Sequence, residues 1–493
     1  MLELREKDKD NDVNDSPGTA LVTENINKKS SKKLYIIIAI SIILILVALA
    51  ITLYFVLRKD KDEDNNTNTN NNPTDEKHNY IKAKYLINEN KLNQIIFYHT
   101  FNNSIESIIV NGIEMSLIDY NITFNESGIF DIEIIFNKNL ISLDNLFYYC
   151  QSLEEVNLSG LITHEVISAV NMFKGCKNLK KVILDNFKAE KLIDISNMFS
   201  GCENLIEINI DAFKYDKLKD IYGLFFNCYK LEQINFGQFN TKNVINMSKL
   251  FSGCISLKEI NLIDAINFKT EKVIDMSYMF QYCKNLENLN LKNFDTSEVI
   301  YMNNMFDSCE KLETVELNNF DTKNVENMYF MFANCISLTS LNLNNFDTSN
   351  VIDMFAMFKN CEKLGLLDII SFNTSLVTDM GEIFMNCNNL TNINLSNFDV
   401  RNVDNMFGMF QNCSALTSLN LSNFETDELI DADYFLANCE NLEILDLRKF
   451  STLKLRNYDE FFNGTDNQVK FYYNSNIFKI NISEEWESVD INE

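Results

Sequence analysis

Residues 309–334 read CEKLETVELNNFDTKNVENMYFMFAN, and a stretch of this kind recurs through most of the chain. It opens on a cysteine and ends two residues after Phe332, just before the cysteine of the next unit. Successive cysteines lie 26 residues apart, except for a gap of 29 between Cys254 and Cys283. The third residue after the cysteine is Leu in all twelve units, and the third residue before it is Phe in eleven. This strict period predicts a solenoid, in which each coil covers the apolar face of its neighbour.

Within each unit the pattern predicts a strand followed by a short helix. Residues 341–343 alternate apolar and polar side chains, as in a half-buried strand. Residues 351–358 carry apolar side chains at spacings of three and four, which predicts one apolar helical face. Asp347 and Thr348 offer N-cap oxygens, and a Gly or Asn before most cysteines, such as Asn360, predicts a left-handed helix stop. The expected fold is an α/β solenoid, a right-handed curved array of strand and short helix units.

The cysteines form one column of the predicted solenoid. Coils stacked at strand spacing, ~4.8 Å, would bring neighbouring thiols within disulfide range, so disulfides between coils stay open as an alternative. No histidine or second cysteine lies near each cysteine within its unit, so no metal site is expected. Because each cysteine adjoins the apolar Leu and Phe columns, we favour a structural ladder of small buried thiols. Its members are Cys150, Cys176, Cys202, Cys228, Cys254, Cys283, Cys309, Cys335, Cys361, Cys387, Cys413 and Cys439.

Composition excludes several classes of function. The formal net charge is −27, and an acidic body repels phosphate backbones, so no nucleic-acid partner is expected. The three histidines, His78, His99 and His164, belong to no nucleophile pattern. No HExxH, P-loop or GxGxxG motif occurs. We therefore expect a protein that is not an enzyme and needs no cofactor.

Residues 34–57 form a long apolar run without a charge. Its 24 residues are enough to cross ~30 Å of hydrocarbon as a helix, which predicts a single transmembrane signal anchor. A cleaved signal peptide ending near Ala50 is the alternative, but the run continues past that residue and its leader is long. Lysines before the run favour a cytoplasmic, disordered tail over residues 1–33 and extracellular repeats. The expected location is the cell membrane, as a single-pass type II protein.

The remaining segments differ in composition. Residues 58–78 are rich in charge, Asn and Thr, which predicts a flexible stalk. Residues 79–136 contain short β-branched and aromatic runs between turn signals, which predicts a small β-rich N-terminal cap over the first coil. The repeats occupy residues 137–463. Residues 464–493 are expected to form a C-terminal cap and an acidic tail.

One outward column of the predicted strands is rich in asparagine. Stacked amides that hydrogen-bond from coil to coil are one explanation of this column, and a binding face is the other. Residues beside the column are charged in early units and neutral in later ones, so the hypothesis places recognition of an extracellular protein or glycan on the outward face of the units that begin at Cys283 to Cys413. The candidate binding-face residues are Asn209, Asn235, Asn261, Asn290, Asn342, Asn394 and Asn420.

Asn-x-Ser/Thr sequons are abundant, partly because the chain is rich in asparagine. They become candidate glycosylation sites if the repeats are extracellular in a eukaryote. The candidates are Asn65, Asn102, Asn121, Asn125, Asn373 and Asn463.

The strand pattern LxxLxL resembles a leucine-rich repeat. The longer stretch MFANCISLTSLNLNNFDTSNVIDM (residues 331–354) closely resembles the 26-residue repeat of BspA-like surface proteins, and the likeness covers residues 137–462. NFDT replaces the usual asparagine turn, and the 29-residue unit carries AINF. The resemblance implies a curved solenoid on a cell surface, used for adhesion or partner binding. A receptor that passes a signal inward and a structural surface coat are the alternatives.

Overall fold

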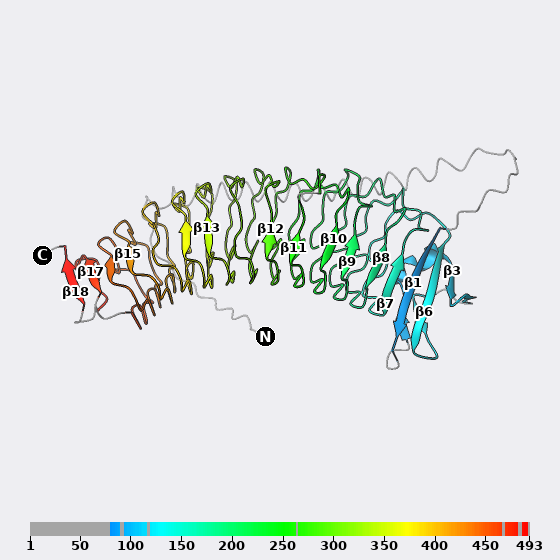
Figure 1. The fold of residues 1–493 in the computed structure, drawn as a ribbon, viewed down its shortest axis with the longest axis horizontal. Helices are drawn as coiled ribbons and strands as arrows, with labels where there is room; N and C mark the ends of the chain where they lie inside the picture. The colour runs from blue at the N-terminus through cyan, green and yellow to red at the C-terminus, as the bar shows by residue number, and fades with distance from the viewer. Residues whose placement is uncertain are drawn as a thin grey trace, which may run out of the picture. The chain divides into compact units, whose positions relative to one another are not determined.

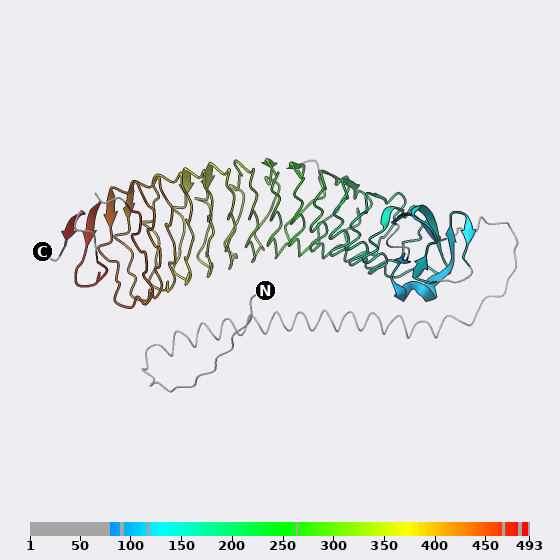
Figure 2. The ribbon, with the colours of Figure 1, turned by 90° about the horizontal axis from the view of Figure 1, so that it is seen from below.

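The computed structural model describes residues 79–88, 93–115, 119–262, 265–465, 469–481 and 486–491. Figures 1 and 2 show the repeats as coils stacked side by side into an elongated, gently curved solenoid. The predicted tail, transmembrane run and stalk, residues 1–78, lie outside the described residues. Within the described ranges, no helix is both long and apolar enough to cross a membrane.

At its N-terminal end the solenoid continues into a cap sheet. β1 pairs antiparallel with β6 on one side and with β7 on the other, and β7 then pairs parallel with β8. β1 is therefore the strand at which antiparallel pairing gives way to the parallel stacking of the coils. In order across the sheet, the strands are β4 (Ile113–Glu114), β3 (Ile105–Val110), β6 (Gly128–Phe136), β1 (Asn79–Ile87), β7 (Leu153–Asn157) and β8 (Lys181–Ile183). A separate pair, β2 (Asn93–Ile95) and β5 (Asn121–Thr123), and the 3-10 helix η1 (His99–Ser104) complete the cap.

Along the coils, very short strands stack in parallel register. Ser340 pairs with Leu366 and Asn342 with Asp368, so equivalent positions of neighbouring coils lie side by side. Near the C-terminus β17 and β18 extend the same parallel sheet. The remaining strands are β9 (Glu207–Asn209), β10 (Gln233–Asn235), β11 (Glu259–Ile260), β12 (Asn288–Leu289), β13 (Ser340–Asn342), β14 (Leu366–Asp368), β15 (Ser418–Asn420), β16 (Ile444–Asp446), β17 (Lys470–Tyr473) and β18 (Glu487–Asp490).

The core is a set of continuous columns. The Phe side chains that stand three residues before each cysteine stack from Phe147 to Phe410, with ring centroids 5.3–6.1 Å apart. The column ends where Leu436 replaces Phe, and there Phe435 meets Phe410 edge-on. Offset stacking of buried rings adds to the burial of their apolar area. Each coil thus supplies one layer of a core that no single coil could bury alone.

The predicted helices are wrong: no described coil contains one. In residues 351–358 the Met357 N–H bonds to the Met354 carbonyl at 3.2 Å, whereas the next N–H, of Phe358, bonds to the following coil at 3.0 Å. This alternation between tight turns and the coil-to-coil ladder leaves no run of helical i→i−4 bonds. Ala356, with φ 53°, also interrupts the segment with a left-handed residue. The fold is therefore a β-solenoid rather than an α/β array.

The residue before each of the twelve cysteines does adopt the predicted left-handed conformation, including Tyr149, Tyr282 and Ser308, which are neither Gly nor Asn. The predicted N-caps are wrong, because no helix follows them. Asp347 Oδ1 accepts the N–H of Ser349 at 3.0 Å and so closes a local turn. Thr348 is fully buried and links two coils.

Candidate functional site

The outward residues of the short strands define the strand face of the solenoid. Six of the seven candidate asparagines are exposed there, and Asn290 is half-buried. The predicted strand register therefore places these side chains on the surface. What they contact decides whether the column is structural.

The asparagines of the strand face cap turns rather than bridging coils. Asn342 Oδ1 accepts the N–H of Asn344 at 3.0 Å, and Asn420 Oδ1 accepts that of Ser422 at 3.0 Å. Such Asx turns end the strand, and aspartate does the same at Asp446. Asn209, Asn235, Asn290 and Asn394 close the same turn. For these asparagines the turn, rather than coil-to-coil amide bonds, accounts for the residue type.

A coil-to-coil amide chain does exist, in the left-handed column before the cysteines. Asn360 Nδ2 donates to Asn334 Oδ1 at 2.7 Å, and Asn438 Nδ2 donates to Asn412 Oδ1 at 2.7 Å. Asn386 completes the chain between them. From the sequence, this column was interpreted only as a helix stop. The unbroken run of Asn from Asn334 to Asn438 could have indicated a ladder of amide hydrogen bonds.

Shallow hollows follow the strand face from the cap to β14. Their volumes are about 400 Å³ at the cap, 580 Å³ at β9 and β10, 410 Å³ at β11 and β12, and 310 Å³ at β13 and β14. All four are lined by outward strand residues. Shallow hollows of this kind can accommodate side chains or sugar groups that protrude from a binding partner.

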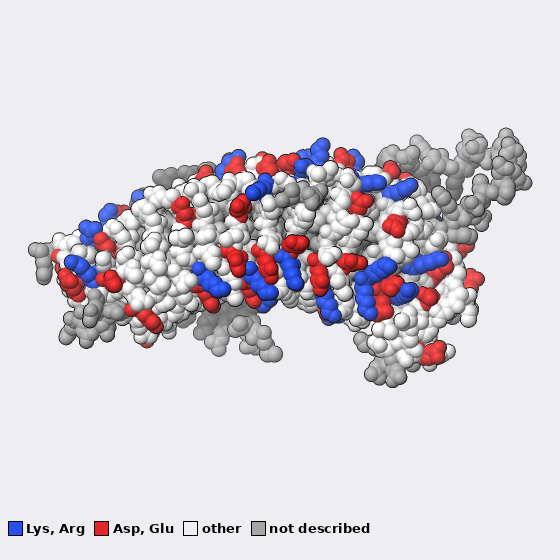
Figure 3. All heavy atoms as spheres, viewed as in Figure 1, with Lys and Arg blue, Asp and Glu red and all other residues white. Residues whose placement is uncertain are grey.

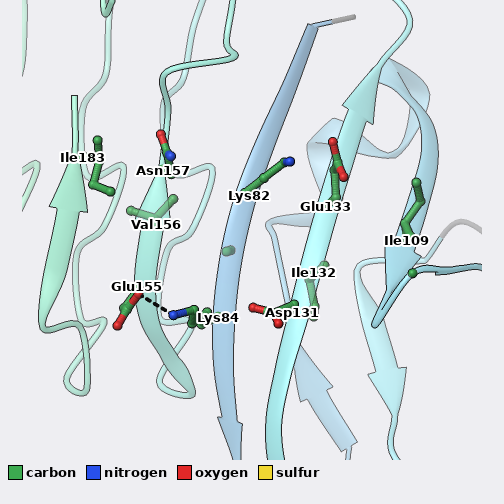
Figure 4. Close-up of a pocket in the computed structure, with 12 residues that line it drawn as sticks. Lys82, Lys84, Ile109, Asp131, Ile132, Glu133, Glu155, Val156, Asn157 and Ile183 are labelled. Carbon is green, nitrogen blue, oxygen red and sulfur yellow. Dashed lines mark ion pairs between the residues drawn. The ribbon is translucent and has the colours of Figure 1, made fainter. Parts of the chain in front are cut away.

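At the cap, the hollow is strongly charged. Lys82, Lys84, Asp131, Glu133 and Glu155 line it, as Figure 4 shows. Lys84 Nζ lies 3.0 Å from Glu155 Oε2, and this hydrogen-bonded pair raises the pKa of Lys84. Three carboxylates against two lysines leave the hollow with a small excess of negative charge.

Charge divides the rest of the strand face into two segments. Near β8 to β12 lysines and glutamates pair between coils, for example Lys292 with Glu316 at 3.3 Å. Figure 3 shows these opposite charges side by side, and a largely uncharged area between β13 and β15. In that area Leu366 is 72% exposed, beside Ser340 and Asn392. The neutral segment, defined by the uncharged strand column of Ser340, Leu366, Asn392 and Ser418, lies within the units that the sequence hypothesis selected.

The cysteines offer no reactive site. All twelve are free and buried. Each thiol from Cys176 onward donates to the carbonyl of the Phe that lies 29 residues earlier, or 32 for Cys283. Burial raises the pKa of Cys387 to about 12 and that of Cys439 to about 12. The thiols therefore remain protonated and unreactive at neutral pH.

The sequons differ in accessibility. Asn125, Asn373 and Asn463 are exposed, whereas Asn102 and Asn121 are half-buried. Asn65 lies outside the described residues. Glycosylation remains a prediction, and the exposed side chains are the more accessible acceptors.

The stacked coils, the parallel strand ladder and the repeated Leu column define a solenoid protein of the leucine-rich-repeat type. The sequence matches the DUF285 family, described as "Mycoplasma protein of unknown function", over residues 141–262, 256–367 and 356–475. The chain belongs to this family, which confirms its resemblance to BspA-like leucine-rich repeat surface proteins. No curated protein matches the sequence.

Two solved structures are similar to the chain. A leucine-rich repeat protein from Bacteroides ovatus is 19% identical, with a TM-score of 0.40, over 73% of this chain and 84% of that one. A leucine-rich cell surface protein from Faecalibacterium prausnitzii is 17% identical, with a TM-score of 0.34, over 66% of this chain and 83% of that one.

Proposed function

We propose that this protein is a non-catalytic surface protein that recognises an extracellular protein or glycan through the neutral segment of its strand face. Residues 34–57 would anchor it in the membrane and hold the repeats outside the cell. The observation that carries the proposal is the exposed Leu366, which lies beside Ser340 and Asn392 in a strand column without charge, at the hollow of β13 and β14 where Asp368 is the one charged lining residue.

Interface cores are poor in charge, and partners gain most from apolar groups that become fully desolvated. Leu366 occupies the strand column in which earlier coils carry Lys181, Glu207 and Glu259. Since the fold accepts charge at this column in those coils, no folding requirement explains why the later coils are neutral. Recognition does explain it, because a buried unpaired charge would weaken the complex.

Lysine substitutions at Ser340, Leu366 and Asn392 test the proposal. These positions close no Asx turn, and Lys181 shows that a coil accepts lysine there. The full-length chain in nanodiscs would be applied to glycan arrays and to arrays of extracellular proteins. We expect saturable binding that the triple variant loses by at least ~100-fold. The matched control, Lys181→Ser with Glu207→Ser, should bind as the native chain does.

Equal binding by the triple variant and the native chain would refute the assignment of the site. The location is tested separately by protease treatment of intact cells that produce the full-length chain. Cleavage of the repeats supports display outside the cell, whereas protected repeats refute it.

A further inference from the structure

A second surface, the turn face, carries residues that the fold does not require. It consists of the residues six, five, two and one positions before each cysteine, at two left-handed turns. The large side chains there are half-buried or exposed, whereas small ones such as Ser248 and Ser277 are buried. Between the coils of Cys228 and Cys387 it gathers a strip of aromatic residues. These are Tyr222, Phe226, Tyr278, Tyr282, Tyr329, Phe330 and Phe355.

Contacts join the strip across coils. Lys249 Nζ lies 5.8 Å from the ring centre of Tyr222, 5.7 Å from that of Phe226 and 5.0 Å from that of Tyr278. The hydroxyls of Tyr278 and Tyr329 are 2.5 Å apart, across an intervening coil. The strip is thus continuous rather than a scatter of single rings. Cation–π contacts hold the lysine in one position.

Several of these residues occupy strained backbone positions. Lys249, Tyr278, Tyr282 and Phe330 have φ values between 55° and 59°, in the left-handed region. In several other coils the equivalent positions hold Asn or Gly, such as Asn171, which tolerate that region, although Tyr149, Tyr434 and Glu460 adopt it outside the strip. Bulky residues there cost of order 1 kcal/mol or more each. Local backbone preference alone would favour asparagine or glycine.

The turn face is also poor in charge on a protein of net charge −27. From Cys228 to Cys387 its charged residues are Lys249, Asp307, Lys359 and Glu382. Asp307 is only 4% exposed, and Lys359 pairs with Glu382 at 2.6 Å. Lys249 forms no ion pair with any described residue. Aromatic, Ser, Asn and Gly side chains with little charge are typical of protein-binding surfaces.

We propose that the turn face binds a second copy of this chain, with the two arrays antiparallel. A two-fold axis across the coil of Cys309 turns the residue columns onto themselves, so most large side chains meet a small one or a second apolar group, whereas Tyr282 meets Asn334. The facing pairs are Tyr222 with Gly381, Phe226 with Met385, Ser248 with Phe355, Ser277 with Tyr329, Tyr278 with Phe330, and Lys249 with Ala356.

Charge supports the same register. Glu382 of one copy faces Gly223 of the other, one coil from Lys249, so these opposite charges come within reach at both ends of the interface. Elsewhere two copies of an acidic chain repel each other. The contact is therefore confined to the face that is nearly neutral.

The area of the strip determines how tightly the two copies can bind. Seven coils at ~4.8 Å give a length of about 30 Å, and the six residues, which form two tight turns, give a width below the ~16 Å of an extended segment. Each copy would bury less than about 500 Å² of surface, or less than about 1,000 Å² in total, which is the size of a weak or transient interface. A weak, micromolar dimer is the expected result.

The mass of the full-length chain in detergent, measured by light scattering with correction for the micelle, tests the proposal. The native chain should dimerise, and Tyr278→Asn with Phe330→Asn should raise the dissociation constant at least ~100-fold. This variant carries the residue that other coils use, so its melting temperature should stay the same or rise. Leu366→Asn, on the strand face, should remain dimeric.

The register has its own test. Lys249→Glu should weaken the dimer, and adding Glu382→Lys should restore it, because the swapped charges attract again. A monomeric native chain, or a double asparagine variant as dimeric as the native chain, would overturn the proposal. So would a monomeric variant with a lowered melting temperature, since the rings would then serve folding. Failure of the charge swap would overturn the antiparallel register.

Discussion

Asn334 Nδ2 donates a hydrogen bond of 2.8 Å to Asp307 Oδ1, and this bond fixes the direction of the amide chain behind it. A carboxylate only accepts hydrogen bonds, so the first asparagine must turn its NH₂ group toward it. Its own oxygen then faces Asn360, and the same orientation passes to Asn438. Asp307 also accepts from Gln281 at 2.9 Å. One buried carboxylate therefore orders a chain that crosses five coils.

Replacing the carboxylate of Asp307 should destabilise the solenoid more than removing Asn438, the side chain at the other end of the amide chain. In Asp307→Asn the new NH₂ group would face donors, which leaves buried groups without an acceptor. We expect a loss of about 2 kcal/mol in the free energy of unfolding. Asn438→Gly keeps the left-handed backbone and loses one bond, so about 1 kcal/mol is expected. Urea unfolding followed by circular dichroism measures both, and equal losses would show that Asp307 has no special role.

The buried threonines provide a second link between coils. Thr348 Oγ1 donates to the carbonyl of Asn373 at 2.8 Å and accepts its N–H at 2.8 Å. Thr348→Val preserves the shape but leaves both backbone groups unpaired, so we expect a loss of about 2 kcal/mol in the same urea experiment.

The opposite substitution serves as a control. Val400 is buried at the position equivalent to Thr348, two coils later. Val400→Thr would offer its hydroxyl to the backbone of Glu425 in the next coil. We expect a gain of up to about 1 kcal/mol. If Thr348→Val cost nothing, the column would be a packing feature and the hydrogen bonds would not contribute.

Much of the repeat could be read from its period. The spacing of cysteine, Leu and Phe defined coils and core columns, because positions that stack must all satisfy the same burial. Alternation in residues 341–343 located β13, and the Gly or Asn before most cysteines marked a left-handed residue. These features depend on local preferences that a single unit already displays.

The turns could not be predicted in the same way. Residues 351–358 have helical spacing, but hydrogen bonds to the next coil compete with those of a helix, and that competition depends on neighbours far away in sequence. Stacking was one of two explanations offered for the strand asparagines, because Asx turns and ladders both favour Asn. The turn face was missed because its aromatic residues, such as Tyr278 and Tyr329, belong to different columns.

The buried thiols should make the protein sensitive to alkali. Burial raises the pKa of Cys283 to about 12 from an ordinary value of 9.0. Above pH 9 the unfolded chain releases thiol protons that the folded chain retains, so stability is full below pH 9 and falls as pH rises toward 12. Each thiol contributes about 1.4 kcal/mol per pH unit in that window. Urea midpoints at pH 8, 9, 10 and 11 measure the slope.

Cys387→Ala is the control for that slope, since tyrosines and lysines also titrate in this range. Removing one thiol should reduce the pH dependence by about 1.4 kcal/mol per unit, although the variant is less stable at pH 8. An unchanged slope would mean that the folded chain releases this proton as easily as the unfolded chain does.

Thiol labelling offers an independent measure of the same burial. Alkylation by iodoacetamide requires a thiolate and access, and in the folded chain burial denies both. At pH 8 the native full-length protein should gain no label in mass spectrometry, whereas the chain in urea without reductant should gain twelve, one for each free cysteine. Ser340→Cys, on the strand face, supplies an exposed thiol and should add one label under native conditions. Fewer than twelve labels in urea would reveal disulfides between coils, and would contradict the free-thiol ladder.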